Sequence, residues 1–393
     1  MPVLFLIVVV DLIGFGVIIP LLPFYAEYYQ ASPAEVGLLM AIYSAAQFIA
    51  APFWGRLSDR IGRRPVLLGT IGAASLSYIL LGFAESLFML FLARAIGGLM
   101  AGNISAAFAY AADVTTRENR AKGMGMVGAA FSIGFILGPA IGGILAGADP
   151  LHADFRTPSF VAAGLSALAF FLGLFVLKES LSPEARAEIK KQTRVARMQA
   201  LFDALKTPGI GILLVLAFLS TLVFAGLEST FAMWSRRQFG WGPEQNGYLF
   251  AFIGVLAAAI QGGLMGKLAV RFGVERLILA GALALSVGLA LVPFVVTVPQ
   301  LVGAMTLAAL GFSIITPALN TAISVRGEAD VQGGLMGVTR SASTLSRMIG
   351  PALGGAAFGF IGIHTPYISG AVIMIAVALL AFVRLIRNPA LKS

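Results

Sequence analysis

Twelve long apolar stretches follow one another along this chain, and each is long enough to cross a lipid bilayer. A spanning helix needs about 20 predominantly apolar residues, and such stretches take up most of the 393 residues. They lack the strict alternation of barrel strands, so they predict helices. The predicted spans cover approximately residues 3–24, 35–55, 65–84, 88–111, 122–147, 157–177, 209–235, 244–266, 277–296, 299–324, 331–358 and 364–386.

Composition supports a membrane protein and argues against several other classes. The chain is 59% hydrophobic and 11% charged, whereas a soluble domain carries about 25% charged residues. The net charge of +9 does not indicate nucleic-acid binding, because the basic residues lie mainly in the loops between spans. With no cysteine, and with both histidines (His152 and His364) in loops, we expect no disulfide, no metal and no cofactor.

The basic residues are divided unevenly between the two sets of loops. With the N-terminus inside, 21 of the 27 Lys and Arg residues fall in inner loops and the C-terminal tail, three in outer loops and three within spans. An excess of Lys and Arg marks cytoplasmic loops. We therefore expect a multi-pass protein of the inner (cytoplasmic) membrane with both termini in the cytoplasm.

Two motifs occur twice at nearly the same separation. GRLSDRIGRRPVLLG begins at Gly55 and GKLAVRFGVERLILAG at Gly266, 211 residues later; GPAIGG begins at Gly138 and GPALGG at Gly350, 212 residues later. A duplicated six-span unit explains both separations, and it predicts an all-α membrane fold of two halves related by a pseudo-two-fold axis. We expect a monomer to be sufficient, because one chain contains both halves. The predicted parts are an N-terminal six-helix bundle at 1–178, a cytoplasmic linker with a surface helix at 179–208 and a C-terminal six-helix bundle at 209–393.

Four motifs resemble those of the major facilitator superfamily, in the expected order. GRLSDRIGRRP, between spans two and three, resembles the signature loop of that superfamily. LARAIGG in span four resembles its proton-antiporter motif, and GFILGPAIGG in span five resembles the motif of its drug antiporters. DLIGFGVIIPLLP resembles the first span of tetracycline-resistance efflux proteins. The resemblance implies export of amphipathic small molecules in exchange for protons, by rocking of two halves around a midplane cavity.

The signature loop and the two GP motifs are predicted to control this conformational change. By resemblance, the loop clasps the inner helix ends and holds the outward-open state; alternatively, its charges only set the topology. We expect Gly55 and Gly62 at tight turns and close approaches of helices, and Asp59 paired with nearby arginines. The predicted gate residues are Gly55, Asp59, Arg60, Gly62, Arg63, Arg64, Asp113, Gly138, Pro139, Gly142, Arg347, Gly350 and Pro351.

Charged side chains within spans are costly and usually functional. Glu228 in span seven is the first candidate for the proton carrier, because a carboxylate in an apolar, partly hydrated cavity takes up protons more readily than one in water. Asp11 is the second candidate, or else a structural partner within its bundle. Arg94 tunes a nearby carboxylate, relays its proton, or forms only structural hydrogen bonds. Arg347 is assigned to the packing motif that follows it, and Arg340 to an anionic group on the substrate.

Polar and aromatic residues of the spans are candidates for substrate contact. Asn and Gln also join membrane helices through hydrogen bonds, and aromatic side chains also serve as packing, so both roles stay open. The candidates are Tyr43, Gln47, Asn103, Phe131, Phe135, Phe231, Trp234, Gln261, Asn320 and Arg340.

Other functions are possible on the same residues. Arginines within spans also fit a transporter of an organic anion, a lipid-like molecule or a specific metabolite. A membrane-embedded enzyme or a receptor is disfavoured. An enzyme needs a nucleophile–base pair or metal ligands close together, and without Cys or intramembrane His only carboxylates and hydroxyls remain in the spans. The span-eight histidine and span-nine aspartate of tetracycline pumps align with Ala257 and Leu285 here, so tetracycline itself is not implied. The expected partners are a small-molecule substrate, protons and membrane lipid.

Overall fold

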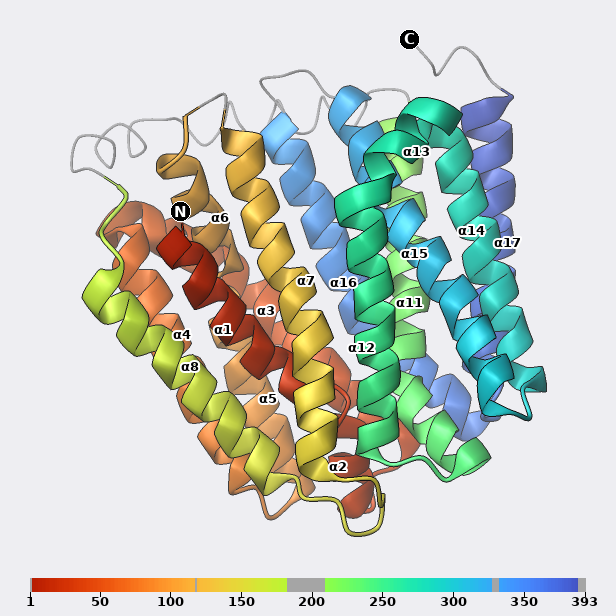
Figure 1. Cartoon of the computed structure of the whole chain (residues 1–393), viewed down its shortest axis with the longest axis horizontal. Coiled ribbons are helices and arrows are strands. Elements are labelled where there is room, and N and C mark those ends of the chain that lie inside the picture. Colours follow the sequence, from red (N-terminus) through yellow and green to blue (C-terminus); the bar gives the residue numbers. More distant parts are fainter. Residues whose placement is uncertain (1, 117–118, 182–208, 327–331, 388–393) are drawn as a thin grey trace. The chain divides into compact units, whose positions relative to one another are not determined.

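The computed structural model describes residues 2–116, 119–181, 209–326 and 332–387. Within these ranges the regular structure is entirely helical, as predicted. Most of the predicted linker lies outside the described residues, and so does the surface helix expected there. Figure 1 colours the helices by their position in the sequence, from red at the N-terminus to blue at the C-terminus.

The helices of the first half begin and end close to the predicted boundaries. The structure has α1 at Pro2–Ile18, α2 at Leu22–Tyr28, α3 at Pro33–Ile61, α4 at Arg63–Gly82, α5 at Leu87–Ala101, α6 at Ile104–Asp113, α7 at Arg120–Ala146 and α8 at Arg156–Val176.

The second half is likewise helical, with two short π-helical segments. It contains α11 at Ile210–Phe239, α12 at Pro243–Ala259, a π-helix at Ile260–Leu264, α13 at Met265–Phe272, α14 at Val274–Leu291, a 3-10 turn at Val292–Phe294, α15 at Val298–Arg326, α16 at Gln332–Phe360, α17 at Thr365–Ala381 and a π-helix at Phe382–Ile386.

Eleven helical stretches of the described residues are long and apolar enough to cross a membrane. They match eleven of the twelve predicted spans. The remaining span corresponds to α16, which has 29 residues but carries two arginines and five hydroxyl side chains. Its length is sufficient for a bilayer, and its polar residues are the kind that line protein rather than lipid.

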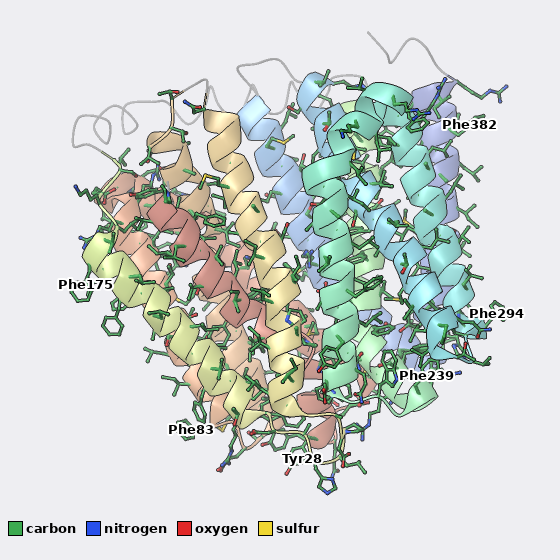
Figure 2. All side chains as sticks on the ribbon, viewed as in Figure 1. Tyr28, Phe83, Phe175, Phe239, Phe294 and Phe382 are labelled. Atoms are coloured by element: carbon green, nitrogen blue, oxygen red, sulfur yellow. The ribbon has the colours of Figure 1, made fainter. Side chains whose placement is uncertain are left out.

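Large apolar side chains remain exposed along these helices, as lipid-facing residues must. Figure 2 labels several of them, including Phe83, Phe175 and Phe294, and Phe175 is 81% exposed. In water such apolar surfaces would promote aggregation, whereas in a bilayer the acyl chains cover them.

Two of the predicted spans are broken rather than continuous. The first span stops at Ile18 and resumes at Leu22, where Pro20 lacks the N–H that would continue the helical hydrogen bonds. The fourth span is interrupted between Ala101 and Ile104. There a Cβ on Gly102 would lie 2.9 Å from the backbone nitrogen of Ala51, so α3 approaches this break closely.

Glycine makes the same turn in both copies of the signature loop. Gly62 ends α3 and precedes α4 with φ +110°, and Gly273 ends α13 and precedes α14 with φ +80°. These positive φ values favour glycine, and the two residues are 211 apart, like the motif starts. The expectation for Gly55 is wrong: this residue lies inside α3, and the nearest atom to a Cβ there would be Ser105 Oγ at 3.7 Å.

Contacts divide the chain into two compact units. The first contains 1–192 with 232–254, and the second contains 193–231 with 255–393. In the first unit α1 packs on α7 and α8, and α3 packs on α5; in the second, α14 packs on α15 and α17. The division cuts through α11 and α12, so the predicted halves at 1–178 and 209–393 remain a prediction.

Glycine allows α7 to touch the backbone of α1. A Cβ on Gly138 would lie 2.5 Å from Gly16 Cα, and one on Gly142 would lie 2.1 Å from the carbonyl oxygen of Val17. The second copy of the motif does the same, because a Cβ on Gly350 would lie 2.5 Å from the carbonyl oxygen of Leu222 on α11. Small residues permit this close approach in membranes.

Gly142→Ala is expected to lower the free energy of unfolding by about 1–3 kcal/mol, because the added methyl group forces α1 and α7 apart. Thermal unfolding of the purified protein in detergent measures the effect. Gly128→Ala is the matched control on the same helix, since nothing lies within 4 Å of its Cβ position. Equal stability of the two variants would contradict this account of the packing.

Candidate functional site

An ion pair joins two spanning helices of the second unit. The Nη1 of Arg347 on α16 lies 3.3 Å from the Oε2 of Glu228 on α11, and the two side chains are 39% and 14% exposed. The close contact at Gly350 brings these helices together one turn away. Sequence reasoning assigned Arg347 to packing and missed its role as the partner of Glu228.

Two aromatic rings stack near this ion pair. Phe224 on α11 and Phe312 on α15 have ring centroids 3.8 Å apart and planes within 5° of parallel. Phe224 lies four residues before Glu228 and therefore on the same face of α11. Both rings are partly buried, and neither was singled out from the sequence, because an aromatic residue in an apolar span carries no distinguishing pattern.

The other substrate candidates of the second half differ in their accessibility. Phe231 and Trp234 are fully buried, at 0% exposure, so a substrate could touch them only after a rearrangement. Gln261, Asn320 and Arg340 are exposed. Gln261 is the second residue of the π-helical segment, a local irregularity that often occurs at functional sites.

Asp11 lies within the first unit and contacts a neighbouring helix. Its Oδ1 accepts a hydrogen bond of 2.8 Å from Ser166 Oγ on α8. It also borders a cavity of about 30 Å³, together with Asn103, Phe131 and apolar side chains of α1, α4, α6 and α7. This volume suffices for a water molecule. The hydrogen bond to Ser166 is consistent with a structural role for Asp11, and the adjacent cavity is consistent with a role as proton carrier. Both roles therefore stay open.

Arg94 and Tyr43 meet on facing helices of the first unit. The guanidinium carbon of Arg94 on α5 lies 4.1 Å from the centroid of the Tyr43 ring on α3. Phe15 of α1 and Phe135 of α7 complete an aromatic group, with centroids 5.2 Å from Tyr43 to Phe15 and 6.2 Å from Phe15 to Phe135. Four of the helices thus bring Arg94 and three aromatic rings together.

Gln47 and Asn103 form hydrogen bonds between helices. Gln47 Nε2 donates to the carbonyl oxygen of Ala101 at 3.1 Å, and Asn103 Nδ2 donates to Thr70 Oγ1 at 2.7 Å. In this structure both amides therefore join helices, one of the two roles left open by the sequence. Asn103 also borders the cavity at Asp11.

The signature loop ties together helix ends within the first unit, with Arg63 at its centre. Arg63 is 6% exposed. Its Nη1 pairs with Asp59 and donates to Ser58 Oγ at 2.7 Å, and its Nε pairs with Asp113 at 3.2 Å. The expected pairing of Asp59 with an arginine is present, and the partner is Arg63.

Glu179 completes this cluster and was not predicted. Its carboxylate accepts hydrogen bonds from the backbone N–H groups of Arg63, at 2.9 Å, and Arg64, at 3.3 Å. It thus satisfies unpaired N–H groups at the start of α4, where a negative charge is favourable. Arg64 donates in turn to the carbonyl oxygen of Leu174 at 2.7 Å. Arg60 is exposed to the surroundings.

A second charged cluster lies in the first unit, at the helix ends that are predicted to face the outside of the membrane. Glu27 is 12% exposed and pairs with Arg236 at 2.9 Å and with Arg237 at 3.3 Å. Nearby, Ser235 Oγ donates to Asn246 Oδ1 at 3.0 Å. This cluster connects α2 with the end of α11, which belongs to the second sequence repeat.

Backbone contacts surround this cluster. A Cβ on Gly143 would lie 2.7 Å from the carbonyl oxygen of Pro243, and one on Gly247 would lie 2.4 Å from that of Pro139. Thus α7 and α12 touch through their backbones. Among the described residues, no three Asp, Glu or His side chains come together as metal ligands would.

Comparison with known proteins matches nearly the whole chain to one family and to resistance proteins. Residues 4–265 and 256–393 match the family model described as Major Facilitator Superfamily. Multidrug resistance protein 2 of Bacillus subtilis (strain 168) is 32% identical over 93% of this chain and 90% of its own length. The class D tetracycline resistance protein of Salmonella ordonez is 33% identical over 98% of this chain and 96% of its own length.

A solved structure shows the same fold. The crystal structure of the human organic anion transporter MFSD10 (TETRAN) covers 97% of this chain and 98% of its own, with a TM-score of 0.73 and 24% sequence identity.

Arg63→Gln is expected to lower the free energy of unfolding by about 2–4 kcal/mol, because it leaves the carboxylates of Asp59 and Asp113 without their shared partner. Thermal unfolding and the yield of folded protein measure the loss. Arg60→Gln, on an exposed side chain of the same segment, is the control and is expected to change stability by less than about 0.5 kcal/mol. A similar loss in both variants would show that Arg63 does not organise the cluster.

Proposed function

This chain belongs to the Major Facilitator Superfamily, and we propose that it exports amphipathic small molecules in exchange for protons. It is a multi-pass membrane transporter of small-molecule substrates, related in sequence to multidrug and tetracycline resistance proteins. Proton coupling, the direction of transport and the placement of both termini in the cytoplasm are parts of the proposal. So are the rocking halves at 1–178 and 209–393.

The ion pair between Glu228 and Arg347 carries the proposal. A carboxylate within a spanning helix is costly, usually pairs with another polar group and often marks a proton or substrate pathway. Protonation of Glu228 would cancel the attraction to Arg347 and loosen the contact between α11 and α16. Binding of a proton would thereby change the preferred arrangement of two spanning helices, which is what coupling requires.

Asp11 and Arg94 are proposed to assist in the first unit. The cavity beside Asp11 has room for a water molecule that could exchange a proton with its carboxylate. Arg94 lies on α5, within a motif that resembles that of proton antiporters. Its positive charge would favour the deprotonated form of a carboxylate that approaches it during the transport cycle.

The contacts at the predicted outer end support alternating access. Glu27 and its two arginines, together with the backbone contacts of α7 and α12, hold segments of both sequence repeats against each other. We propose that these contacts close the outer side of the pathway and separate when substrate is released. The signature loop around Arg63 and the GP motifs at Gly138 and Gly350 would guide the same movement from the inner side.

An exporter of organic anions is the second candidate. Arg340 is exposed on α16, and Arg347 on the same helix is 39% exposed in its ion pair. Both could receive a negatively charged group. Competition between an organic anion and a lipophilic cation for transport distinguishes the two candidates.

Glu228→Gln is expected to abolish substrate-triggered proton flux, with a loss of at least tenfold, while substrate counterflow persists. Gln keeps the shape of the side chain but cannot exchange a proton. Proteoliposomes with an internal pH dye, given a tetracycline, a lipophilic cation and an organic anion in turn, provide the measurement.

Two further variants control this experiment. Glu85→Gln changes a carboxylate that is 79% exposed and is expected to leave the flux unchanged. The double variant Glu228→Gln with Arg347→Gln removes both charges and reports whether any loss of folding comes from an unpaired Arg347. Normal proton-driven transport by Glu228→Gln would exclude Glu228 as the carrier.

Glu27→Gln is expected to open the outer side more often, because loss of the pairs with Arg236 and Arg237 removes about 1 kcal/mol, or about a fivefold population shift. The chain has no cysteine, so Ser235→Cys provides one reporter at a fully buried position. Its rate of labelling by a membrane-impermeant maleimide from outside should rise about fivefold with Glu27→Gln. It should not change with Glu85→Gln, and an unchanged rate in both would contradict the proposed closure.

A further inference from the structure

Arg94 is a buried cation without a charge partner among the described residues. It is 4% exposed and takes part in no ion pair there, and its Nε has no hydrogen-bond partner. Arg63 and Arg347, by contrast, each contact a carboxylate. An uncompensated charge inside a membrane protein is costly, so Arg94 would gain from an anion supplied by a ligand.

The contact with Tyr43 leaves hydrogen-bonding capacity on Arg94. The ring covers the guanidinium carbon at 4.1 Å and stabilises its charge through the π electrons. The N–H groups of a guanidinium lie in its plane, where they can bind both oxygens of a carboxylate. The Nε of Arg94 has no hydrogen-bond partner, so the contact with the ring leaves donors of Arg94 for a ligand.

Glycine packing fixes the position of this pair. A Cβ on Gly98 would lie 2.3 Å from the carbonyl oxygen of Tyr43, and one on Gly97 would lie 3.1 Å from Ser77 Oγ. These glycines lie three and four residues after Arg94, on the same face of α5. The cation and the ring beneath it are thus held in place before any ligand arrives, which lowers the cost of binding.

Aromatic surface lies beside the cation. Tyr43, Phe15 and Phe135 come from three different helices, and each is only partly buried. Their rings pack edge-on or tilted rather than stacked, so a further flat ring can be added against their faces. The carboxylate of Asp11, also on α1, accepts its hydrogen bond from Ser166 and is not paired with Arg94.

We infer that Arg94, Tyr43, Phe15 and Phe135 form a binding subsite for the acidic group and the adjoining ring of an aromatic carboxylate. The inference rests on the proposed export function and adds a substrate class to it: amphipathic molecules whose polar end is an anion attached to a flat apolar frame. The guanidinium binds the carboxylate, and the three rings contact the frame.

Binding of three matched probes to the full chain in lipid nanodiscs tests the subsite. The probes are 2-naphthoate, its neutral methyl ester and the cationic 2-naphthylmethylamine, measured by naphthalene fluorescence with empty nanodiscs subtracted. The wild type is expected to bind the anion at least tenfold more tightly than the ester, and the ester more tightly than the cation. Equal affinities, or no binding of the anion at about 1 mM, would overturn the inference.

Variants then assign the preference to Arg94. Arg94→Gln should reduce the difference between anion and ester to below twofold and leave the affinity for the ester unchanged. Arg94→Lys keeps the charge but loses the planar donors, and should show an intermediate preference; it also serves if Arg94→Gln does not fold. Arg156→Gln changes an arginine that is 64% exposed and should behave as the wild type. An undiminished anion preference in both Arg94 variants would overturn the inference.

The proton-flux experiment separates this inference from the proposed function. Proton flux that depends on Glu228, without any preference for the anion, would retain the export function and remove the subsite. An anion preference that depends on Arg94, without proton flux for any probe, would retain the subsite and remove proton coupling.

Discussion

A helix in lipid satisfies its own backbone hydrogen bonds, and its apolar side chains gain little by leaving acyl chains for protein. What holds spanning helices together is therefore close contact, and here glycine provides it. The α7 backbone touches α1 at Gly138 and Gly142, and α16 touches α11 at Gly350. Glycine contacts also lie beside functional residues. Arg347 is one turn from Gly350, and Gly97 and Gly98, which meet Ser77 and Tyr43, follow Arg94 by one turn.

The second constraint is the cost of charge in an apolar medium, and the chain meets it in different ways. Arg63, at a helix end, shares two carboxylates and a serine hydroxyl. Glu228 and Arg347 compensate each other within the spans. Asp11 has a hydroxyl and a small cavity, and Arg94 has an aromatic ring. Arg94 has the weakest compensation, so an anionic ligand makes the largest difference there, and we assign recognition to it. We assign coupling to Glu228, because protonation of its carboxylate would break an existing ion pair.

Much of the fold could be predicted from sequence, because its determinants are local. Span length, the excess of basic residues in one set of loops and the two repeated motifs can each be recognised in short stretches of sequence, without knowledge of tertiary contacts. The positive φ values at Gly62 and Gly273 agree with the repeat. The breaks after Ile18 and Ala101 were missed, although Pro20 and Gly102 are signals for them. The partners of Arg347 and Gln47 could not be predicted, because a helix that is apolar on all sides does not reveal which face meets which neighbour. The partners of Glu179 could not be predicted either, because this residue follows α8 in a segment without regular structure.

The glycine contacts also restrict how the substrate range of such a transporter can change. A methyl group at Gly98 or Gly142 would collide with the backbone of another helix. Substitution of either glycine therefore destabilises the helix packing, whatever its effect on substrate recognition. Phe15, Tyr43 and Phe135 are partly exposed, and a change in the size of one ring alters contacts between side chains rather than the backbone contacts at the glycines. Substitutions that adapt the transporter to a new compound are therefore expected at these aromatic positions and not at the glycines where the helices touch.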